Sequence, residues 1–286
     1  MKNRLWLLFA IITTLFWGVW GAFIEIPEKA GFPATLGYSV WALTMIPCAL
    51  VALKIIAWHL EYDRRSMFLG SVVGLLGAGG QLILFEALRL GPAYLVFPII
   101  SLYPVVTVAL SVAILQERAD RRASVGIALA LVAMVLLSYQ PPTGSPAQGY
   151  FWLLLAIAVF FMWGVQAFVM KFSNETMKAE SIFFYMMATA LVLIPVALLM
   201  TDFTQHINWG FKGPYLAAMV QVLNAIGALC LVYAVRFGKA IVVVPMTSLA
   251  PVLTIVISLL IYRVMPHPVL ITGMALASIS IYLMAE

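Results

Sequence analysis

The sequence predicts an all-α integral membrane protein, with ten transmembrane helices arranged as two inverted five-helix repeats. Three observations support this fold class. Of the 286 residues, 64% are hydrophobic and only 9% are charged, whereas a soluble domain usually carries about 25% charged residues. The chain contains about ten apolar runs that are long enough to cross a hydrocarbon core as helices. One proline-containing apolar segment also occurs twice, once in each half of the chain.

The expected membrane-spanning helices follow one another along the whole chain. They are placed near residues 5–24, 34–57, 67–88, 93–115, 123–139, 149–171, 181–200, 213–235, 240–262 and 268–285. The first run follows Lys2 and Arg4, as the core of a secretory signal peptide also does. Its apolar part is longer than a usual signal core, and no small-residue cleavage site precedes Glu25. We therefore interpret this run as a retained helix.

The distribution of basic residues predicts how the chain crosses the membrane. If alternate loops lie on the side of the amino terminus, that side holds twelve of the sixteen Lys and Arg residues. Cytoplasmic loops of membrane proteins carry such an excess. We therefore expect a multi-pass protein of the cell inner membrane or plasma membrane with both termini in the cytoplasm. This distribution also explains the net charge of +5, so no nucleic-acid partner is expected.

The duplicated segment reads GPAYLVFPIISLYPVVT at Gly91–Thr107 and GKAIVVVPMTSLAPVLT at Gly238–Thr254. Nine of the seventeen positions are identical, and the two copies are 147 residues apart. Apolar segments of similar composition agree at only about two such positions by chance, so an internal repeat is the better explanation.

The relation between the two halves extends beyond this segment. Trp17, Gly18 and Val19 match the WGV sequence at 163–165 with an offset of 146 residues. The chain is therefore expected to consist of two repeats, residues 1–141 and residues 148–286. Because five is an odd number of helices, the second repeat enters the membrane from the opposite side. Inverted repeats of this kind are common in secondary transporters.

Each copy of the duplicated segment carries two prolines, which are Pro98 and Pro104 in the first copy and Pro245 and Pro251 in the second. Proline inside a helix removes one amide donor and clashes with the carbonyl four residues back. In a membrane, the freed carbonyl must be satisfied by protein or by a hydrated cavity. We expect these prolines to bend helices that line or gate a central cavity. The alternative is that they only set helix curvature.

Polar and aromatic side chains inside the expected helices are the candidates for substrate binding. Polar groups are costly in hydrocarbon and therefore face the interior of a helix bundle. Aromatic walls with a few amides and hydroxyls suit a partly apolar small molecule, although any single residue could instead form an interhelical hydrogen bond. The candidate substrate-binding residues are Trp17, Trp20, Gln81, Tyr103, Trp163, Gln166, Gln221, Asn224, Thr247 and Ser248.

Three charged residues near the outer ends of helices are candidates for gating or coupling. Glu86 lies about one turn from the outer end of the third expected helix, and Arg89 follows three residues later. The two could form an outer gate, or Glu86 could bind a proton or a cationic substrate. The alternative is an ion pair at the membrane interface, with Arg89 reaching outward. Glu25, at the outer end of the first expected helix, is a similar candidate.

The sequence offers no catalytic or metal-binding constellation. It lacks an HExxH motif, paired CxxC motifs, a nucleophile elbow and an EF-hand loop. The glycines between Gly70 and Gly80 lack the Lys-Ser/Thr ending of a phosphate-binding loop. Cys48 and Cys230 do not have the spacing of metal ligands. We therefore expect no enzymatic activity, no cofactor and no metal site.

The stretch ALRLGPAYLVFPIISLYPVVTVALSVAILQERADRRASVGIALALVAMVLL resembles the second part of an EamA domain, from the drug/metabolite transporter (DMT) superfamily. The segments at Trp17 and Trp163 look like the opening helix of that domain. The resemblance covers essentially the whole chain as two tandem EamA repeats, 1–141 and 148–286. It implies cytoplasmic termini and a central cavity. The first, third, fourth, sixth, eighth and ninth of the ten expected helices would mainly line this cavity.

The two repeats differ at one position that the family resemblance makes informative. The first repeat keeps the family's glutamate after the fourth helix, which is Glu117. The equivalent stretch of the second repeat, Tyr262–Met265, has no carboxylate. A mechanism that needs two symmetric carboxylates at this point is therefore not expected.

Together these features predict a secondary active transporter. It would export a small amino-acid-, sugar- or amine-like metabolite by alternating access through a central cavity. The alternatives are an uptake carrier or facilitator for a sugar or nucleoside-like solute, a channel, and an intramembrane enzyme. The expected partners are the substrate, the lipid bilayer, and a coupled proton or counter-substrate. We expect a monomer or a weak homodimer.

Overall fold

The computed structural model describes residues 4–139, 149–262 and 267–285. Every regular element within these ranges is a helix, which confirms the expected all-α class. The first half contains α1 (Leu5–Phe23), α2 (Glu25–Lys29), α3 (Ala34–Ile55), α4 (Arg64–Leu90), α5 (Ala93–Ser101), α6 (Tyr103–Ala113) and α7 (Arg121–Leu137). The second half contains α8 (Phe151–Ser173), α9 (Ala179–Val192), α10 (Ile194–Leu199), the π-helical turn η1 (Phe211–Tyr215), α11 (Leu216–Phe237), α12 (Ala240–Thr247), α13 (Ala250–Tyr262) and α14 (Pro268–Ala285).

The helices are long and apolar enough to account for the expected membrane crossings. In the described part of the chain, nine helical stretches meet the length and hydropathy expected of a membrane span. The tenth crossing corresponds to α7, which has 17 residues and is therefore about 25 Å long. This length is at the lower limit for a span. The protein is therefore an integral membrane protein of two five-span halves.

Charged residues begin the helices at the edges of the apolar region. The Asp63 carboxylate accepts hydrogen bonds from the backbone N–H groups of Arg65 and Ser66, both at 3.1 Å, at the start of α4. Asp120 accepts from the Ala123 N–H at 2.7 Å at the start of α7. Such caps satisfy amide donors that have no partner inside the helix. They fix the starts of two helices at one surface of the bundle.

The fourth and ninth expected spans are each broken into two helices. In the first half the break falls at Leu102, between α5 and α6, and in the second half at Ser248 and Leu249, between α12 and α13. Leu249 follows Leu102 by 147 residues, the offset of the repeat. Pro104 and Pro251 each occupy the second position of the helix that follows the break. A proline is tolerated there because the first amides of a helix have no intrahelical partner.

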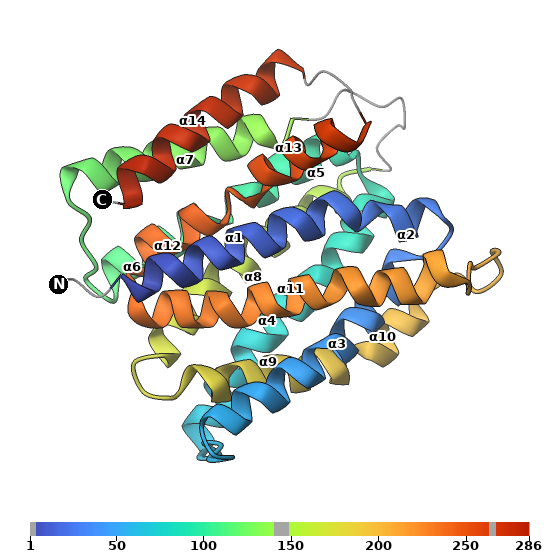
Figure 1. Ribbon diagram of the computed structural model, residues 1–286, viewed down its shortest axis with the longest axis horizontal. Helices are drawn as coiled ribbons and strands as arrows, with labels where there is room; N and C mark the ends of the chain where they lie inside the picture. Colours follow the sequence, from blue (N-terminus) through green and yellow to red (C-terminus); the bar gives the residue numbers. More distant parts are fainter. Residues whose placement is uncertain (1–3, 140–148, 263–266, 286) are drawn as a thin grey trace.

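The two halves interlock through reciprocal packing. Helix α1 packs along α11 and α13, and the equivalent helix α8 packs along α4 and α6. Figure 1 shows α1 beside α11, and α7 beside α14 at one edge of the bundle. Each half therefore packs its first helix against equivalent elements of the other half. This reciprocal packing agrees with the two expected five-helix repeats.

The start of α1 and the end of α14 lie on the same side of the bundle, at the left of Figure 1. We call this side the terminal face and the opposite side the far face. Helices α1, α4, α7, α9 and α12 begin at the terminal face, and α3, α8, α11 and α14 end there.

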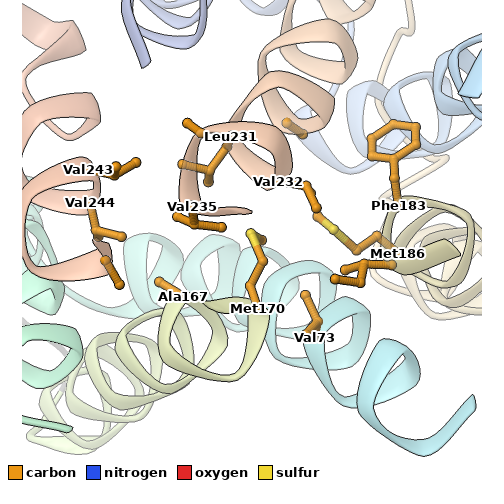
Figure 2. Close-up of a cluster of buried hydrophobic side chains, with 14 of the residues drawn as sticks. Val73, Ala167, Met170, Phe183, Met186, Leu231, Val232, Val235, Val243 and Val244 are labelled. Carbon is orange, nitrogen blue, oxygen red and sulfur yellow. The ribbon is translucent and has the colours of Figure 1, made fainter. Parts of the chain in front are cut away.

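A set of buried apolar side chains fills the bundle near the terminal face (Figure 2). It joins α4, α8, α9, α11 and α12, and we call it the terminal-side plug. Its labelled members are Val73, Ala167, Met170, Phe183, Met186, Leu231, Val232, Val235, Val243 and Val244. Met170, Val232 and Val235 are at most 1% exposed.

Candidate substrate site

Two tryptophans occupy equivalent positions near the middle of the bundle. The Trp17 indole N–H donates to the Asn224 carbonyl at 3.3 Å, and the Trp163 indole N–H donates to the Gly77 carbonyl, also at 3.3 Å. Asn224 follows Gly77 by 147 residues, and Trp163 follows Trp17 by 146. Each indole therefore joins its own half to the other half in the same way.

Glycines make room for these two rings. A Cβ atom added to Gly227 would lie 2.5 Å from Trp17 Cδ1, and one added to Gly80 would lie 2.6 Å from Trp163 Nε1. Gly227 and Gly80 are themselves related by the offset of 147. Even a methyl group at either position would overlap the indole, so both contacts depend on glycine.

Two threonines tie the broken helices to the first helix of the opposite half. The Thr107 hydroxyl donates to the Gly164 carbonyl at 2.8 Å, and the Thr254 hydroxyl donates to the Gly18 carbonyl at 2.9 Å. These threonines end the duplicated sequence segment, but the sequence did not indicate that their hydroxyls bridge the halves. Their identical positions in the two copies were the available signal.

Amide and indole groups from α1 and α11 form a neutral hydrogen-bonded cluster. The Trp20 indole N–H donates to Gln221 Oε1 at 3.0 Å, and Gln221 Nε2 donates to the Gly37 carbonyl at 3.3 Å. Asn224 Nδ2 approaches the same Gln221 oxygen at 3.5 Å. Gln221 is only 5% exposed, so its polar atoms depend on these protein partners. The structure thus brings Trp17, Trp20, Gln221 and Asn224 together.

A second polar contact lies where the two broken helices meet. Tyr103 Oη and Ser248 Oγ are 2.7 Å apart. Because the Ser248 hydroxyl donates to the Val244 carbonyl at 2.8 Å, it accepts from Tyr103. The Tyr103 ring also packs edge-on against Trp163, with 6.0 Å between the ring centroids. Tyr103, Trp163 and Ser248 therefore form one group that joins the halves.

The remaining substrate-binding candidates lie around these groups with different roles. Gln166 packs directly against Gly77, since a Cβ atom added there would lie 2.3 Å from Gln166 Nε2. Thr247 is fully buried, and its hydroxyl donates to the Val243 carbonyl of its own helix at 3.0 Å. Gln81 is half-buried on α4, and no hydrogen bond joins its side chain to the cluster within the described residues. Of these three residues, Gln166 is the one that the structure places against a backbone partner of the cluster, Gly77.

The charged candidates form ion pairs near the far face, away from the cluster. Arg89 Nε donates to Glu86 at 2.8 Å, and the Arg89 side chain is 69% exposed. Lys29 donates to Glu25, and both side chains are more than half exposed. This arrangement matches the alternative of interfacial ion pairs. The prolines differ in burial, because Pro104 and Pro245 are buried, Pro98 is half-buried and Pro251 is exposed.

Two recesses lie outside the central cluster. One has a volume of about 190 Å³ at the far face and is lined by Glu28, Gly31, Phe32, Pro33, Gln205, His206 and Ile207. The other, of about 180 Å³, is lined by Ile11, Thr14, Leu15, Met246 and Ile281. Within the described ranges, no three His, Cys, Asp or Glu side chains are grouped so as to hold a metal ion. The central cluster itself contains indole, phenol, hydroxyl and amide groups.

Comparisons with known proteins agree with the two-half architecture. Residues 4–139 and 150–285 each match the sequence model described as the EamA-like transporter family. An uncharacterised protein of Methanocaldococcus jannaschii is 28% identical over 132 residues, which are 46% of this chain and 95% of that protein. That relative therefore has about the length of one half. A protein of known crystal structure superposes with a TM-score of 0.79, at 16% identity, over 99% of this chain and 98% of its own. At that identity the likeness shows the fold alone.

Proposed function

The chain belongs to the EamA-like transporter family, and from this premise we propose that it is a secondary active transporter of a small organic metabolite. Its two halves exchange conformations, so that the central cluster opens to one face and then to the other. Export is the proposed direction, and an uptake carrier or facilitator for a sugar or nucleoside-like solute is the alternative.

One observation carries this proposal, namely the reciprocal attachment of the two halves at Trp17 and Trp163. Each indole holds the opposite half through a single backbone carbonyl at 3.3 Å. Because the two attachments are equivalent, the halves can exchange conformations and produce an equivalent arrangement that opens to the opposite face. A channel needs no such equivalence. The buried terminal-side plug supports a closed conformation of the terminal face.

The groups in the cluster support a compact, partly apolar solute. Trp17, Trp20, Trp163 and Tyr103 provide aromatic surfaces, while Gln221, Asn224 and Gln166 provide uncharged donors and acceptors. Aromatic faces also attract ammonium groups. This chemistry favours an amine-like, amino-acid-like or sugar-like solute.

We further propose that the terminal face is cytoplasmic in the cell inner membrane or plasma membrane. Of the fourteen Lys and Arg residues that the structure describes, eleven belong to the loops and helix ends of that side. Among them, Arg64 and Arg65 begin α4, and Arg121 and Arg122 begin α7. An excess of basic residues marks the cytoplasmic side of membrane proteins.

Thermal stabilisation of the purified protein by a panel of metabolites tests this function. A transported solute should raise the melting temperature, because a ligand that binds only the folded state stabilises it. Trp163→Ala should abolish that rise, whereas Trp58→Ala, which changes a tryptophan that is 60% exposed, should preserve it. Equal stabilisation of both variants would place the solute outside the cluster. A solute that is transported yet insensitive to Trp163→Ala would contradict the site.

A further inference from the structure

A buried ion pair lies at the terminal face, where the two halves meet. Glu117 follows α6 in the first half, and Lys171 lies near the end of α8 in the second. Their charged atoms are 3.9 Å apart, and their side chains are only 9% and 15% exposed. Buried charges are costly unless they are paired and hydrogen-bonded. The partners of each charge therefore indicate what the pair holds in place.

Glu117 caps the start of α12 across the boundary between the halves. Its two carboxylate oxygens accept hydrogen bonds from the backbone N–H groups of Ala240 and Ile241, both at 3.1 Å. A carboxylate at this position satisfies two amides that have no intrahelical partner and interacts favourably with the helix dipole. The side chain of Lys239, the residue before α12, donates in turn to the Arg118 carbonyl. The loop after α6 is thus attached to the first turn of α12.

Lys171 binds backbone carbonyls at the end of α11, the helix that precedes α12. Its ammonium group donates to the Val235 carbonyl at 2.9 Å and to the Gly238 carbonyl at 2.8 Å. These partners belong to the second half, as Lys171 does. If the halves separate at the terminal face, Lys171 keeps both carbonyls, whereas Glu117 loses Ala240, Ile241 and Lys171 together. The contacts of Glu117 are therefore the ones that opening must break.

The far face is built differently at the equivalent positions. The offset of 147 relates Glu117 to Val264, which lies outside the described residues, and the offset of 146 relates Lys171 to Glu25. Glu25 is 58% exposed and is paired with Lys29. The surrounding packing is nevertheless symmetric, because Gly91 lies against Trp152 as Gly238 lies against Trp6. At these positions the Gly–Trp contacts are alike on the two faces, whereas Lys171 and Glu25 differ in charge and exposure.

The ion pair lies at the same end of the bundle as the plug. Val235, Val243 and Val244 belong to the plug (Figure 2), and they flank the turn that Glu117 and Lys171 hold. Movement of α12 away from the first half would expose these valines and the interior behind them.

We propose that Glu117, through Lys171 and the first amides of α12, is a latch that keeps the terminal face closed. The inference rests on the proposed alternating access. It identifies contacts that favour the state closed at the terminal face. Without the latch, the population of molecules that are open at the terminal face increases, because among the described residues no equivalent ion pair joins the halves at the far face.

Cysteine labelling tests the latch without any knowledge of the solute. In a background with Cys48→Ala and Cys230→Ala, the reporter is Ala167→Cys, which replaces a plug residue that is 5% exposed. A membrane-impermeant maleimide is added from the terminal face of sealed vesicles. Glu117→Gln should accelerate labelling at least about fivefold, the lower end of usual coupling between sites. The matched control, Glu86→Gln at the far face, should leave the labelling rate unchanged.

A second variant guards against simple loss of folding. Glu117→Gln with Lys171→Gln removes both charges, so neither is left buried without its partner. Faster labelling in this variant, at a melting temperature close to that of the background, supports the latch. Labelling no faster than in the background would overturn it. If labelling accelerates but no solute of the panel is transported, the proposed function fails while the latch stands.

Discussion

Trp17 and Trp163 hold each other's half of the protein through equivalent hydrogen bonds, 3.3 Å long, to the carbonyls of Asn224 and Gly77. Both acceptors are backbone groups, so the contacts depend on the approach of α1 to α11 and of α8 to α4. That approach is permitted by Gly227 and Gly80, where a Cβ atom would overlap the indole.

Gly80→Val and Gly227→Val should therefore each destabilise the protein by about 1–3 kcal/mol, the usual cost of overpacking. Thermal melting of the purified variants measures the effect. Gly79→Ala is the matched control, because its nearest neighbour is the flexible end of Met162 at 3.3 Å. Melting temperatures for both valine variants equal to that of the control would show that the indoles move away without cost.

Trp163→Ala and Asn224→Ala should weaken substrate binding more than they weaken folding. Among the described residues, the Asn224 side chain takes part in one hydrogen bond, a long one of 3.5 Å to Gln221. Its carbonyl, which accepts from Trp17, is retained in the alanine variant. The apparent affinity for the transported solute should fall about tenfold or more, the equivalent of one lost good contact. Unchanged affinity in stably folded variants would show that Trp163 and Asn224 do not bind the solute.

The division into two equivalent halves could be predicted from the sequence, because the residues that recur in the repeat are residues that pack between the helices. The pairs Trp17–Gly18 and Trp163–Gly164 recur at an offset of 146 residues. This constant offset shows which residues of the two halves occupy equivalent positions in the fold. The orientation of single hydroxyls and carboxylates could not be predicted in this way. Thr247 looked available to a ligand, yet its hydroxyl bonds its own helix.

The ion pair at the terminal face shows the same limit more clearly. Glu117 and Lys171 are separated by 54 positions in the chain, and only the folded bundle places both beside the turn between α11 and α12. The family resemblance singled out Glu117, but nothing in the sequence indicated Lys171 or the amides of Ala240 and Ile241 as its partners. Long-range partners of this kind are set by tertiary packing.

Pro98→Ala and Pro245→Ala should shift the balance between the two access states in opposite directions. Each change restores an amide and removes the clash of the ring inside its helix, α5 or α12, so the helix itself should be stable. Labelling of cysteines placed near each mouth, at equal expression, measures the shift. Accessibility identical to that of the wild type in both variants would leave the prolines as determinants of curvature only.

A carboxyl-terminal tag should be protected in intact cells, because the excess of basic residues at the terminal face predicts a cytoplasmic location. The tag should react with an impermeant reagent only after the membrane is opened. A tag in the loop near residue 205, at the far face, serves as the positive control. Reaction of the carboxyl-terminal tag in intact cells would invert the proposed topology.

Counterflow in proteoliposomes tests the central claim, alternating access by two inverted halves, most directly. Vesicles are loaded with a high concentration of an unlabelled solute that stabilises the protein, and they are diluted into a trace of the labelled solute. A carrier must return through its solute-bound states, so labelled solute should accumulate transiently above its external concentration, and Trp163→Ala should abolish the accumulation. Equilibration without any overshoot, at a rate that does not saturate, would show a pore instead and would contradict the account.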